Sequence, residues 1–392
     1  MLISPVATTA GFTQEKQEAL LPVYAQMPVR PVSGRGSWLI DEEGNRWLDA
    51  YGGHAVASTG HSHPRVVQAI AEQAGRLLFY STAVPLPVRD QLANRLASLC
   101  PAPLEKVFFC NSGAEANENA LHLARRHTGR TTIVTLTGGW HGRTVATLAC
   151  CDGRKYEEGA RRAGMPLSRR AAFGDIASLD AALDGDVAAL LLEPVQGMAG
   201  ARECSREFLE RARMLCTDRG IVLIFDEIQC GAGRSGAFTA AEAFGVTPDI
   251  ITMAKGLASG LPIGAVVACS ALTTSLATGD LGSTFGGGPV PCAAALATLD
   301  VIDDENLLAN VRQVEEFVRS QCRRLGINVQ GKGLLLGLRL PIAALTVQRA
   351  LFEQRILTGT STDPNVLRLL PPLTFSIAEA DILLRAMSEV LF

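Results

Sequence analysis

Two apolar segments are the strongest indication of the fold of this chain: Ile221-Val222-Leu223-Ile224-Phe225-Asp226-Glu227 and, further along, Pro248-Asp249-Ile250-Ile251-Thr252-Met253-Ala254-Lys255. Each stretch is a run of β-branched and aliphatic residues bounded by turn residues, which predicts a short buried strand. The first strand ends in two acids, Asp226 and Glu227, and the second delivers an amine, Lys255. The separation of 29 residues between Asp226 and Lys255 leaves room for a crossover connection between parallel strands.

An acid and an amine at the ends of buried strands point to one cofactor. A carboxylate and an ammonium group are costly to remove from water unless something uses them. Pyridoxal 5'-phosphate (PLP) needs both, because it forms a Schiff base with a lysine and requires an acid to keep its pyridine nitrogen protonated. The sequence therefore predicts Lys255 and Asp226 as the catalytic pair of a PLP site.

Around this pair, apolar strands alternate with helical stretches from Lys106 to about Ala268. Such alternation predicts a mainly parallel sheet with helices on both faces, an α/β fold. Ligands of these sheets bind beyond the carboxyl ends of the strands, where the proposed cofactor residues stand. The expected strands are 106–110, 132–136, 187–192, 221–225, 250–253 and 263–268.

The two ends of the chain are predicted to form a second, smaller domain. The other expected elements are a hairpin over 38–49, helices at 64–79, 88–99, 291–302 and 305–325, strands within 327–340, and a final helix capped by Ser376 and Glu379. The predicted parts are an N-terminal segment 1–60 that joins the small domain, a large PLP-binding domain 61–289 and a C-terminal small domain 290–392.

Composition narrows the class of protein. The 392 residues suffice for about two to three domains, and a net charge of −3 gives no electrostatic case for nucleic acid or membrane binding. Only 19% of residues are charged, below the usual ~25%, which favours a surface buried against another subunit. The ten scattered cysteines form no metal motif and suit a reduced cytoplasm. Residues 1–16 lack the pattern of a secretory signal, and no apolar run approaches the ~20 residues that span a bilayer.

The stretch 111–118, NSGAEANE, follows the first expected strand. Ser112 and Glu115 suit a well-capped helix and nothing more. Alternatively the stretch is a phosphate cradle, because Gly113 lets the backbone approach closely and helix N-terminal amides favour an anion. Its position immediately after a strand favours the cradle.

The stretch 137–144, TGGWHGRT, also follows an expected strand. Trp140 stands between glycines, where it either stacks on a flat cofactor or packs as an ordinary aromatic residue. Arg143 presents a planar fork that matches a carboxylate, although a surface arginine is the simpler interpretation.

The sequence leaves the roles of four further features open. Glu193 ends an apolar run and is as easily structural as functional, while Gln229 lies three residues after Asp226 and could reach a ring hydroxyl. The glycine-rich loop 283–289 suits a hinge or a second phosphate contact. Arg368 stands alone in an apolar strand and needs a partner, either a structural acid or a substrate carboxylate.

Together these motifs resemble the class III (ω-)aminotransferases of the fold type I PLP enzymes, and most closely the acetylornithine/ornithine aminotransferase branch. The resemblance runs from about Trp47 to Phe375. It rests on GHSHP (60–64), NSGAEANE (111–118), WHGRT (140–144), EPVQG (193–197), IFDEIQCGAGRSG (224–236), PDIITMAKGL (248–257), GSTFGG (282–287), GKG (331–333) and RLLPP (368–372).

The resemblance implies a mainly parallel seven-stranded sheet in the large domain, a smaller α+β domain and no metal. It implies that Lys255 carries the cofactor and moves the proton, that Asp226 pairs with the pyridine nitrogen, and that Thr284 reaches in from a neighbouring subunit of a homodimer with shared active sites. The implied cofactor-binding residues are Ser112, Gly113, Ala114, Trp140, His141, Glu193, Asp226, Gln229, Lys255 and Thr284. The implied substrate-binding residues are Arg143, Ser283 and Arg368, of which the two arginines hold the carboxylates of 2-oxoglutarate or glutamate.

The implied activity is a cytoplasmic PLP-dependent aminotransferase. It would move an amino group between an ω-amino donor, such as N-acetylornithine or ornithine, and 2-oxoglutarate/glutamate by a ping-pong mechanism, as in arginine biosynthesis. Alternatives are a class III aminotransferase of a specialised pathway, a same-fold aminomutase, racemase or decarboxylase, and a non-catalytic binding protein.

One departure from the family pattern bears on the substrate. After EPVQG the ornithine-type enzymes carry a glutamate that neutralises the arginine matched by Arg368, whereas Met198 stands there in this chain. Trp140 replaces a Phe or Tyr, Gly288 replaces an Asn, and Leu281 stands where relatives often have a His. Because methionine cannot accept a salt bridge, the hypothesis is that Arg368 is permanently ungated, which means that no carboxylate of the protein neutralises it before a substrate binds.

Overall fold

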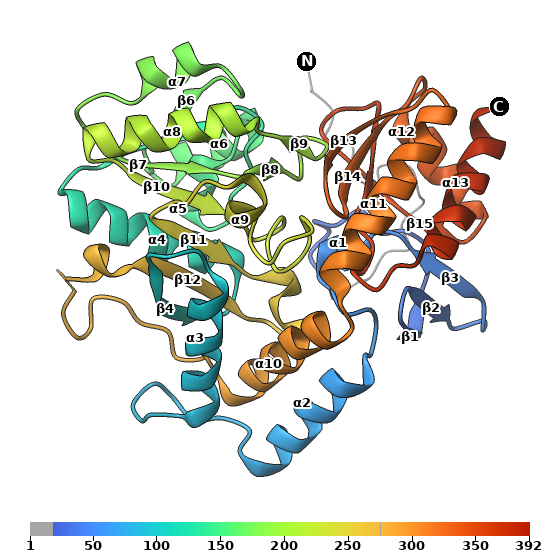
Figure 1. Ribbon diagram of the computed structural model, residues 1–392, viewed down its shortest axis with the longest axis horizontal. Helices are drawn as coiled ribbons and strands as arrows, with labels where there is room; N and C mark the ends of the chain where they lie inside the picture. Colours follow the sequence, from blue (N-terminus) through green and yellow to red (C-terminus); the bar gives the residue numbers. More distant parts are fainter. Residues whose placement is uncertain (1–18, 275) are drawn as a thin grey trace.

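A seven-stranded sheet forms the centre of the larger part of the molecule in the computed structural model, which describes residues 19–274 and 276–392 (Figure 1). Only β12 runs antiparallel to its neighbours, so the predicted α/β fold with a mainly parallel seven-stranded sheet is confirmed. The strands, in spatial order, are β4 (Leu104–Cys110), β12 (Gly264–Cys269), β11 (Ile250–Met253), β10 (Val222–Asp226), β7 (Val187–Leu192), β5 (Thr132–Leu136) and β6 (Arg169–Ala171).

The central strands are apolar throughout because both faces of the sheet are covered. Every residue of β7, β10, β11 and β12 is buried, as expected for strands with helices on both sides. Along β10, Leu223 and Phe225 join one apolar cluster while Val222 and Ile224 join the cluster on the opposite face. Each such side chain contributes about 1.5–3 kcal/mol when it is fully buried.

The six strands expected from the sequence are all present; β5, β7 and β11 have the predicted ends, and the ends of the other three differ by at most two residues. The strand that no pattern predicted is β6, at the edge of the sheet, whose Arg169-Arg170-Ala171 carries two charges and no apolar run. The helices of this part are α2 (Pro64–Arg76), α3 (Pro87–Leu99), α4 (Gly113–Thr128), α5 (Val145–Cys150), α6 (Arg154–Arg162), α7 (Ile176–Ala182), α8 (Arg206–Arg219) and α9 (Ala240–Phe244), with short turns α1 (Gly52–Ala55), η1 (Lys255–Ala258) and η2 (Ser270–Thr273).

A second apolar core lies beside the first and is built from both ends of the chain. Leu48 and Ala50 pack there with side chains from Val301 to Met387. The predicted hairpin is confirmed, because β2 and β3 pair antiparallel, and so is the capping box of Ser376 and Glu379. One sheet contains β1 (Pro31–Arg35), β2 (Trp38–Asp41), β3 (Arg46–Asp49) and β15 (Ile356–Leu357), and the other β13 (Asn328–Lys332), β14 (Leu335–Arg339), β17 (Val366–Leu369) and β16 (Gly359–Thr360). The helices are α11 (Leu307–Arg324), α12 (Ala344–Glu353) and α13 (Ile377–Leu391).

Helix α10 (Pro289–Asp304) and a small two-stranded sheet lie where the two parts meet. Helix α10 packs on α2 and α3 and leads into the second core (Figure 1). The small sheet of β8 (Val195–Gln196) and β9 (Arg202–Glu203) carries Met198 in its turn toward β16 and β17. In the described ranges no helix is both long and apolar enough to cross a membrane. The predictions for residues 1–18 fall outside the described residues.

Candidate active site

The two predicted catalytic residues lie at the same edge of the sheet. Asp226 is the last residue of β10 and pairs in register with Thr252 of the neighbouring β11, so Lys255 follows three residues later. Lys255 has a φ of +45°, in the left-handed region that a residue with a side chain enters at a cost. Such strain persists only where the surroundings impose it, and it clusters at functional sites.

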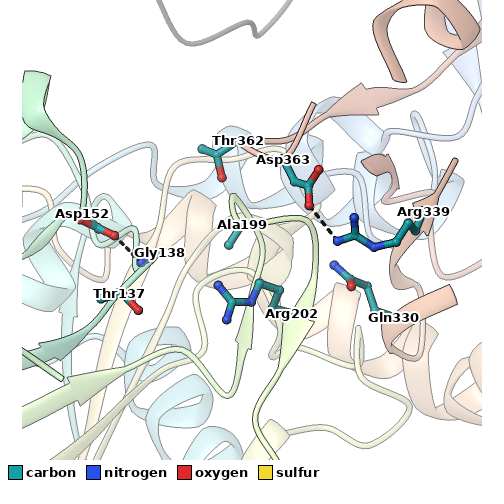
Figure 2. Close-up of a pocket in the computed structure, with 9 residues that line it drawn as sticks. All are labelled: Thr137, Gly138, Asp152, Ala199, Arg202, Gln330, Arg339, Thr362 and Asp363. Carbon is teal, nitrogen blue, oxygen red and sulfur yellow. Dashed lines mark hydrogen bonds and ion pairs between the residues drawn. The ribbon is translucent and has the colours of Figure 1, made fainter. Parts of the chain in front are cut away.

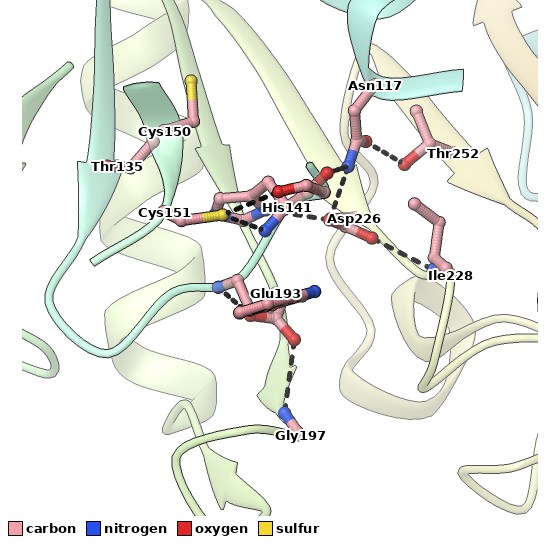
Figure 3. Close-up of polar contacts among 12 residues, drawn as sticks. Asn117, Thr135, His141, Cys150, Cys151, Glu193, Gly197, Asp226, Ile228 and Thr252 are labelled. Carbon is pink, nitrogen blue, oxygen red and sulfur yellow. Dashed lines mark hydrogen bonds and ion pairs between the residues drawn. The ribbon is translucent and has the colours of Figure 1, made fainter. Parts of the chain in front are cut away.

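Asp226 is held by three donors (Figure 3). One carboxylate oxygen accepts from His141 Nδ1 and from Asn117 Nδ2, both at 2.8 Å, and the other accepts from the Ile228 amide at 3.1 Å. Asn117 in turn accepts from the Thr252 hydroxyl at 2.7 Å. These bonds satisfy the oxygens of a carboxylate that is only 3% exposed, and they fix its position at the edge of the site.

The same network fixes the proton of His141. Since the carboxylate of Asp226 only accepts, Nδ1 of His141 carries the hydrogen. Its Nε2 is buried and has no hydrogen-bond partner among the described residues. His141 therefore acts on Asp226 and has no bond of its own toward the site.

Glu193 ties the loop after β5 to the turn after β7. One carboxylate oxygen accepts from the Trp140 amide at 2.8 Å, and the other accepts from the Gly197 amide at 3.2 Å (Figure 3). Burial raises the pKa of Glu193, His141 opposes the rise electrostatically, and Asp226 adds to it. The position of Trp140 thus depends on this acid.

The start of α4 has the features of a phosphate cradle. The hydroxyl of Ser112 accepts from the Glu115 amide at 3.2 Å, which confirms the predicted cap, and the Ala116 amide bonds to the Ser112 carbonyl. The Gly113 and Ala114 amides have no acceptor among the described residues, as is usual for the first turn of a helix.

A neighbouring glycine keeps this cradle accessible. A Cβ added at Gly142 would lie 2.6 Å from Thr147 Oγ1 and 2.9 Å from Ala114 Cβ, so only glycine lets the loop lie against the helix start. Two free amides at a helix N-terminus, an anchored acid and a nearby lysine are the groups that PLP requires. The residues present therefore fit this cofactor.

Lys255 and Trp140 complete this end of the site. Lys255 is partly buried, and removal from water lowers the pKa of its amine, against the opposing effect of Asp226 and Glu193. The Trp140 ring has Tyr156 at its edge, with centroids 4.9 Å apart. The guanidinium carbon of Arg143 lies 5.2 Å from the Trp140 ring. Arg143 itself is exposed and forms no ion pair within the described residues.

Arg368 on β17 is a buried cation with neutral partners. It is 1% exposed, and its guanidinium donates to the Thr360 carbonyl at 2.7 Å, the Gly197 carbonyl at 3.2 Å and the Tyr51 hydroxyl at 3.1 Å. Across residues 19–274 and 276–392 no carboxylate lies within ion-pair distance of it. Of the two partners that the sequence suggested for Arg368, the structural acid is therefore not found among the described residues.

The remaining predicted residues lie at the margins of the candidate active site. Gln229 Nε2 is 3.5 Å from the His54 carbonyl. Ser283 accepts from Asn111 Nδ2 at 3.1 Å, which places it beside the start of α4. Thr284 is exposed on the next position of the loop and has no hydrogen bond to the other predicted site residues in the part of the subunit that is described.

Three residues of the site were not predicted from the sequence: Asn117, Tyr51 and His54. Asn117 is fully buried on the apolar face of α4, and a polar residue within that stripe was a usable signal. Tyr51 and His54 flank a glycine pair whose backbone conformation the sequence did not reveal.

A polar cavity of about 420 Å³ opens between the two cores (Figure 2). It shares the loops at Gly138 and Ala199 with the site, but Lys255, Asp226 and Arg368 do not line it. Its lining residues are Thr137, Gly138, Asp152, Ala199, Arg202, Gln330, Arg339, Thr362 and Asp363. No group of three His, Cys, Asp or Glu side chains suited to a metal ion occurs in the part of the chain described.

Comparison with known proteins gives consistent matches. The model of the aminotransferase class-III family matches residues 22–391. The acetylornithine aminotransferase of Methanocaldococcus jannaschii is 38% identical over 384 residues, which are 94% of this chain and 95% of that one. Acetylornithine aminotransferase 1 of Bordetella bronchiseptica is 41% identical over 381 residues, 94% and 96% of the two chains.

Solved structures agree with the sequence relatives. The ornithine aminotransferase of Toxoplasma gondii superposes with a TM-score of 0.89 at 30% identity, over 95% of this chain and 92% of that one. A second structure of that enzyme is described with partial occupancy of PLP at its active site. A transaminase from Virgibacillus has a TM-score of 0.88 at 25% identity, over 93% of each chain.

Proposed function

The chain belongs to the class III aminotransferase family and is a PLP-dependent transaminase, and on this basis we propose its substrates and the roles of its residues. The proposed reaction moves an amino group between an ω-amino donor of the N-acetylornithine or ornithine type and the 2-oxoglutarate/glutamate pair. The relatives named for acetylornithine and ornithine support this choice, and arginine biosynthesis is the proposed setting.

The single observation that carries the proposal is the pair of arginines. Arg368 is a buried guanidinium that the described residues leave without a carboxylate, and Arg143 is exposed and equally free of an ion pair. A buried cation is stabilised when an anion reaches it. One buried and one exposed arginine, which with Lys255 all act electrostatically on His54, suit a substrate with two carboxylates, as 2-oxoglutarate and glutamate have.

At the cofactor, the proposed roles follow from the contacts. When bound, PLP is an electron sink that stabilises the negative charge left by a departing proton. The Gly113 and Ala114 amides bind its phosphate, and Asp226 holds the proton on the pyridine nitrogen. Trp140 stacks on the ring, and Glu193 holds the Trp140 backbone in place.

Lys255 is the proposed proton carrier. An amine is a base and a nucleophile only when it is deprotonated, and its lowered pKa favours that form. Its place next to Asp226, at the carboxyl ends of adjacent parallel strands, supports its role. His141 and Asn117 are positioning residues, since they act through Asp226.

We further propose a homodimer with shared active sites. The exposed side chains of Leu77, Leu78, Phe79, Tyr80 and Val84 lie next to the loop of Thr284, since the rings of Phe79 and Phe285 are 5.1 Å apart. An exposed apolar patch favours a protein interface. Thr284, one residue before Phe285, would then reach the phosphate site of the neighbouring subunit. The ten free, buried cysteines suit the proposed cytoplasmic location.

The test is a set of half-reactions. The PLP-loaded enzyme is mixed in turn with glutamate, N-acetylornithine, ornithine, 4-aminobutyrate and lysine, and the loss of the visible cofactor band is followed. Fast bleaching by glutamate and by N-acetylornithine is expected. Bleaching by glutamate alone would overturn the proposed donor and favour a specialised pathway. Turnover without a 2-oxo acid would instead indicate an aminomutase, racemase or decarboxylase.

A further inference from the structure

A left-handed turn lies beside the site, where α1 packs against η1, the turn that begins at Lys255. The four consecutive residues Gly52, Gly53, His54 and Ala55 have φ values of +57°, +56°, +67° and +66°. For residues with a side chain this conformation costs roughly 1–2 kcal/mol each. It persists here because it is held at both sides, and strain of this kind gathers where a ligand binds.

The anchors of the turn are specific. Asp49 accepts from the Tyr51 and Gly52 amides at 2.9 and 2.8 Å, and its other oxygen is 2.7 Å from His61 Nε2. A Cβ at Gly52 would lie 2.6 Å from the Leu370 carbonyl oxygen, so the turn rests against the strand end that follows Arg368. The position of the turn is therefore tied to β17.

Tyr51 links this turn to the buried arginine. A Cβ at Gly359 would lie 2.1 Å from Tyr51 Cε2, so the glycine makes room for the ring. The Tyr51 hydroxyl accepts from Arg368 at 3.1 Å and is 2.8 Å from His54 Nδ1. The rings of Tyr51 and His54 meet edge to face, with centroids 4.9 Å apart.

These hydrogen bonds determine which ring nitrogen of His54 carries the hydrogen. A guanidinium only donates, so the Tyr51 oxygen accepts from Arg368 and keeps its own hydrogen for His54 Nδ1. His54 Nδ1 is then the acceptor, and Nε2 carries the ring hydrogen. His54 is exposed, so Nε2–H is available as a neutral hydrogen-bond donor beside the site.

The charges around His54 are mostly positive. Partial removal from water, and then Arg368, Lys255 and Arg143, lower the pKa of His54, and only Asp49 opposes them. Asp49 is already bonded to His61. A substrate that brings a second ammonium group to this place would add another positive charge close to the guanidinium groups of Arg368 and Arg143, which is unfavourable.

We propose that His54 is a specificity-determining residue, whose Nε2–H donates to the acyl oxygen of an Nα-acylated diamino acid. The ω-amine of this substrate stays free to react, and the hydrogen bond favours it over the unacylated diamino acid. The inference rests on the proposed function and deepens it. Acylation removes the ammonium charge and supplies an uncharged oxygen acceptor in one step. Both changes suit the neutral Nε2–H of His54, which lies close to positively charged side chains.

The test compares two substrates in three variants of the holoenzyme. His54→Leu removes the donor, His54→Gln keeps an N–H near the position of Nε2, and both bring a side chain of similar length to the left-handed position. We expect His54→Leu to lower the ratio of kcat/KM for N-acetylornithine to that for ornithine by roughly three- to tenfold, the size of one neutral hydrogen bond. His54→Gln is expected to restore most of the ratio, and His122→Leu, an exposed histidine of α4, to leave it unchanged.

The outcomes separate the two levels of proposal. If the wild-type enzyme reacts with N-acetylornithine and His54→Leu has the wild-type ratio, the role of His54 is overturned while the proposed function stands. If the wild-type enzyme reacts with glutamate but with neither ornithine compound, the proposed donor is overturned, and the role of His54 with it. Tyr51→Phe, which keeps the ring and loses the hydroxyl, should lower the same ratio by a smaller factor.

Discussion

The two ends of the site stabilise their charges in opposite ways. At the cofactor end, Asp226 and Glu193 are buried acids that accept hydrogen bonds from the protein itself. At the substrate end, Arg368 is equally buried but meets only two carbonyls and a hydroxyl. A charge that is fully partnered is fixed, whereas a buried charge with neutral partners still attracts a counter-ion. The cofactor end is thus built in advance, and the substrate end depends on the carboxylate that arrives.

The largest expected effect comes from removing the amine of the cofactor end. Lys255→Ala should abolish the visible absorption of lysine-bound cofactor and reduce turnover on the order of 10³-fold or more, since the proton carrier is lost. Spectra of the PLP-loaded variant, with borohydride reduction and peptide mapping, would check this. A lysine-linked adduct that survives the substitution would refute the assignment.

The next effect is expected from the acid of the same end. Asp226→Asn keeps the shape but loses the charge that holds the pyridine proton, so kcat with glutamate should fall by about 10²- to 10³-fold. Thermal unfolding of the variant controls for damage to the network of His141 and Asn117. A properly folded variant with a loss under tenfold would show that the charge of Asp226 is dispensable.

Glu227, the residue after Asp226, is expected to make the free energy of unfolding depend on pH. Glu227 is 1% exposed, and burial raises its pKa to about 8, although the Ala240 and Ala241 amides oppose the rise. Between the ordinary glutamate value near 4.5 and about 8, the unfolded chain has lost this proton while the folded chain keeps it. The free energy of unfolding should therefore fall as pH rises through this window, by up to about 1.4 kcal/mol per pH unit.

Denaturant titrations from pH 5 to 9 would measure this slope. Glu227→Gln should remove the contribution of this group, so that the difference between variant and wild type grows in favour of the variant up to about pH 8 and is then constant. A difference that does not change with pH would contradict the shifted pKa.

The smallest effect is expected at the substrate end. Met198→Glu would offer Arg368 a carboxylate, so ω-amine donors should improve relative to glutamate by roughly two- to fivefold, within the range of a partly exposed ion pair. Met198→Gln, which adds a polar group without charge, is the matched control. If the ratio of the half-reaction rates for ω-amine donors and glutamate does not change, the hypothesis that Arg368 is ungated is refuted. The contrast between the cofactor end and the substrate end of the site would then be lost.

Much of the fold was predictable because its determinants are local. Strands β7, β10 and β11 are continuous apolar runs, and the caps at Ser112 and Ser376 are short motifs, so each was readable within a few residues. The edge strand β6 was missed because neither its length nor its charged residues distinguish it from a loop. The antiparallel direction of β12 also depends on how the chain returns to the sheet.

The cofactor could be inferred from the amino-acid sequence alone, since an acid and a lysine at the ends of two buried runs suit PLP and the ordered motifs agree with it. The partners of the buried charges, in contrast, depend on the three-dimensional packing of the chain. His141 and Asp226 are 85 positions apart, and Tyr51 and Arg368 are 317 apart. Hydrogen bonds between such distant residues, and the left-handed turn that presents His54, depend on the packing of one part against the other. Local residue patterns carry the preference for strand or helix, whereas the partners of a buried charge are fixed only once the chain has closed around it.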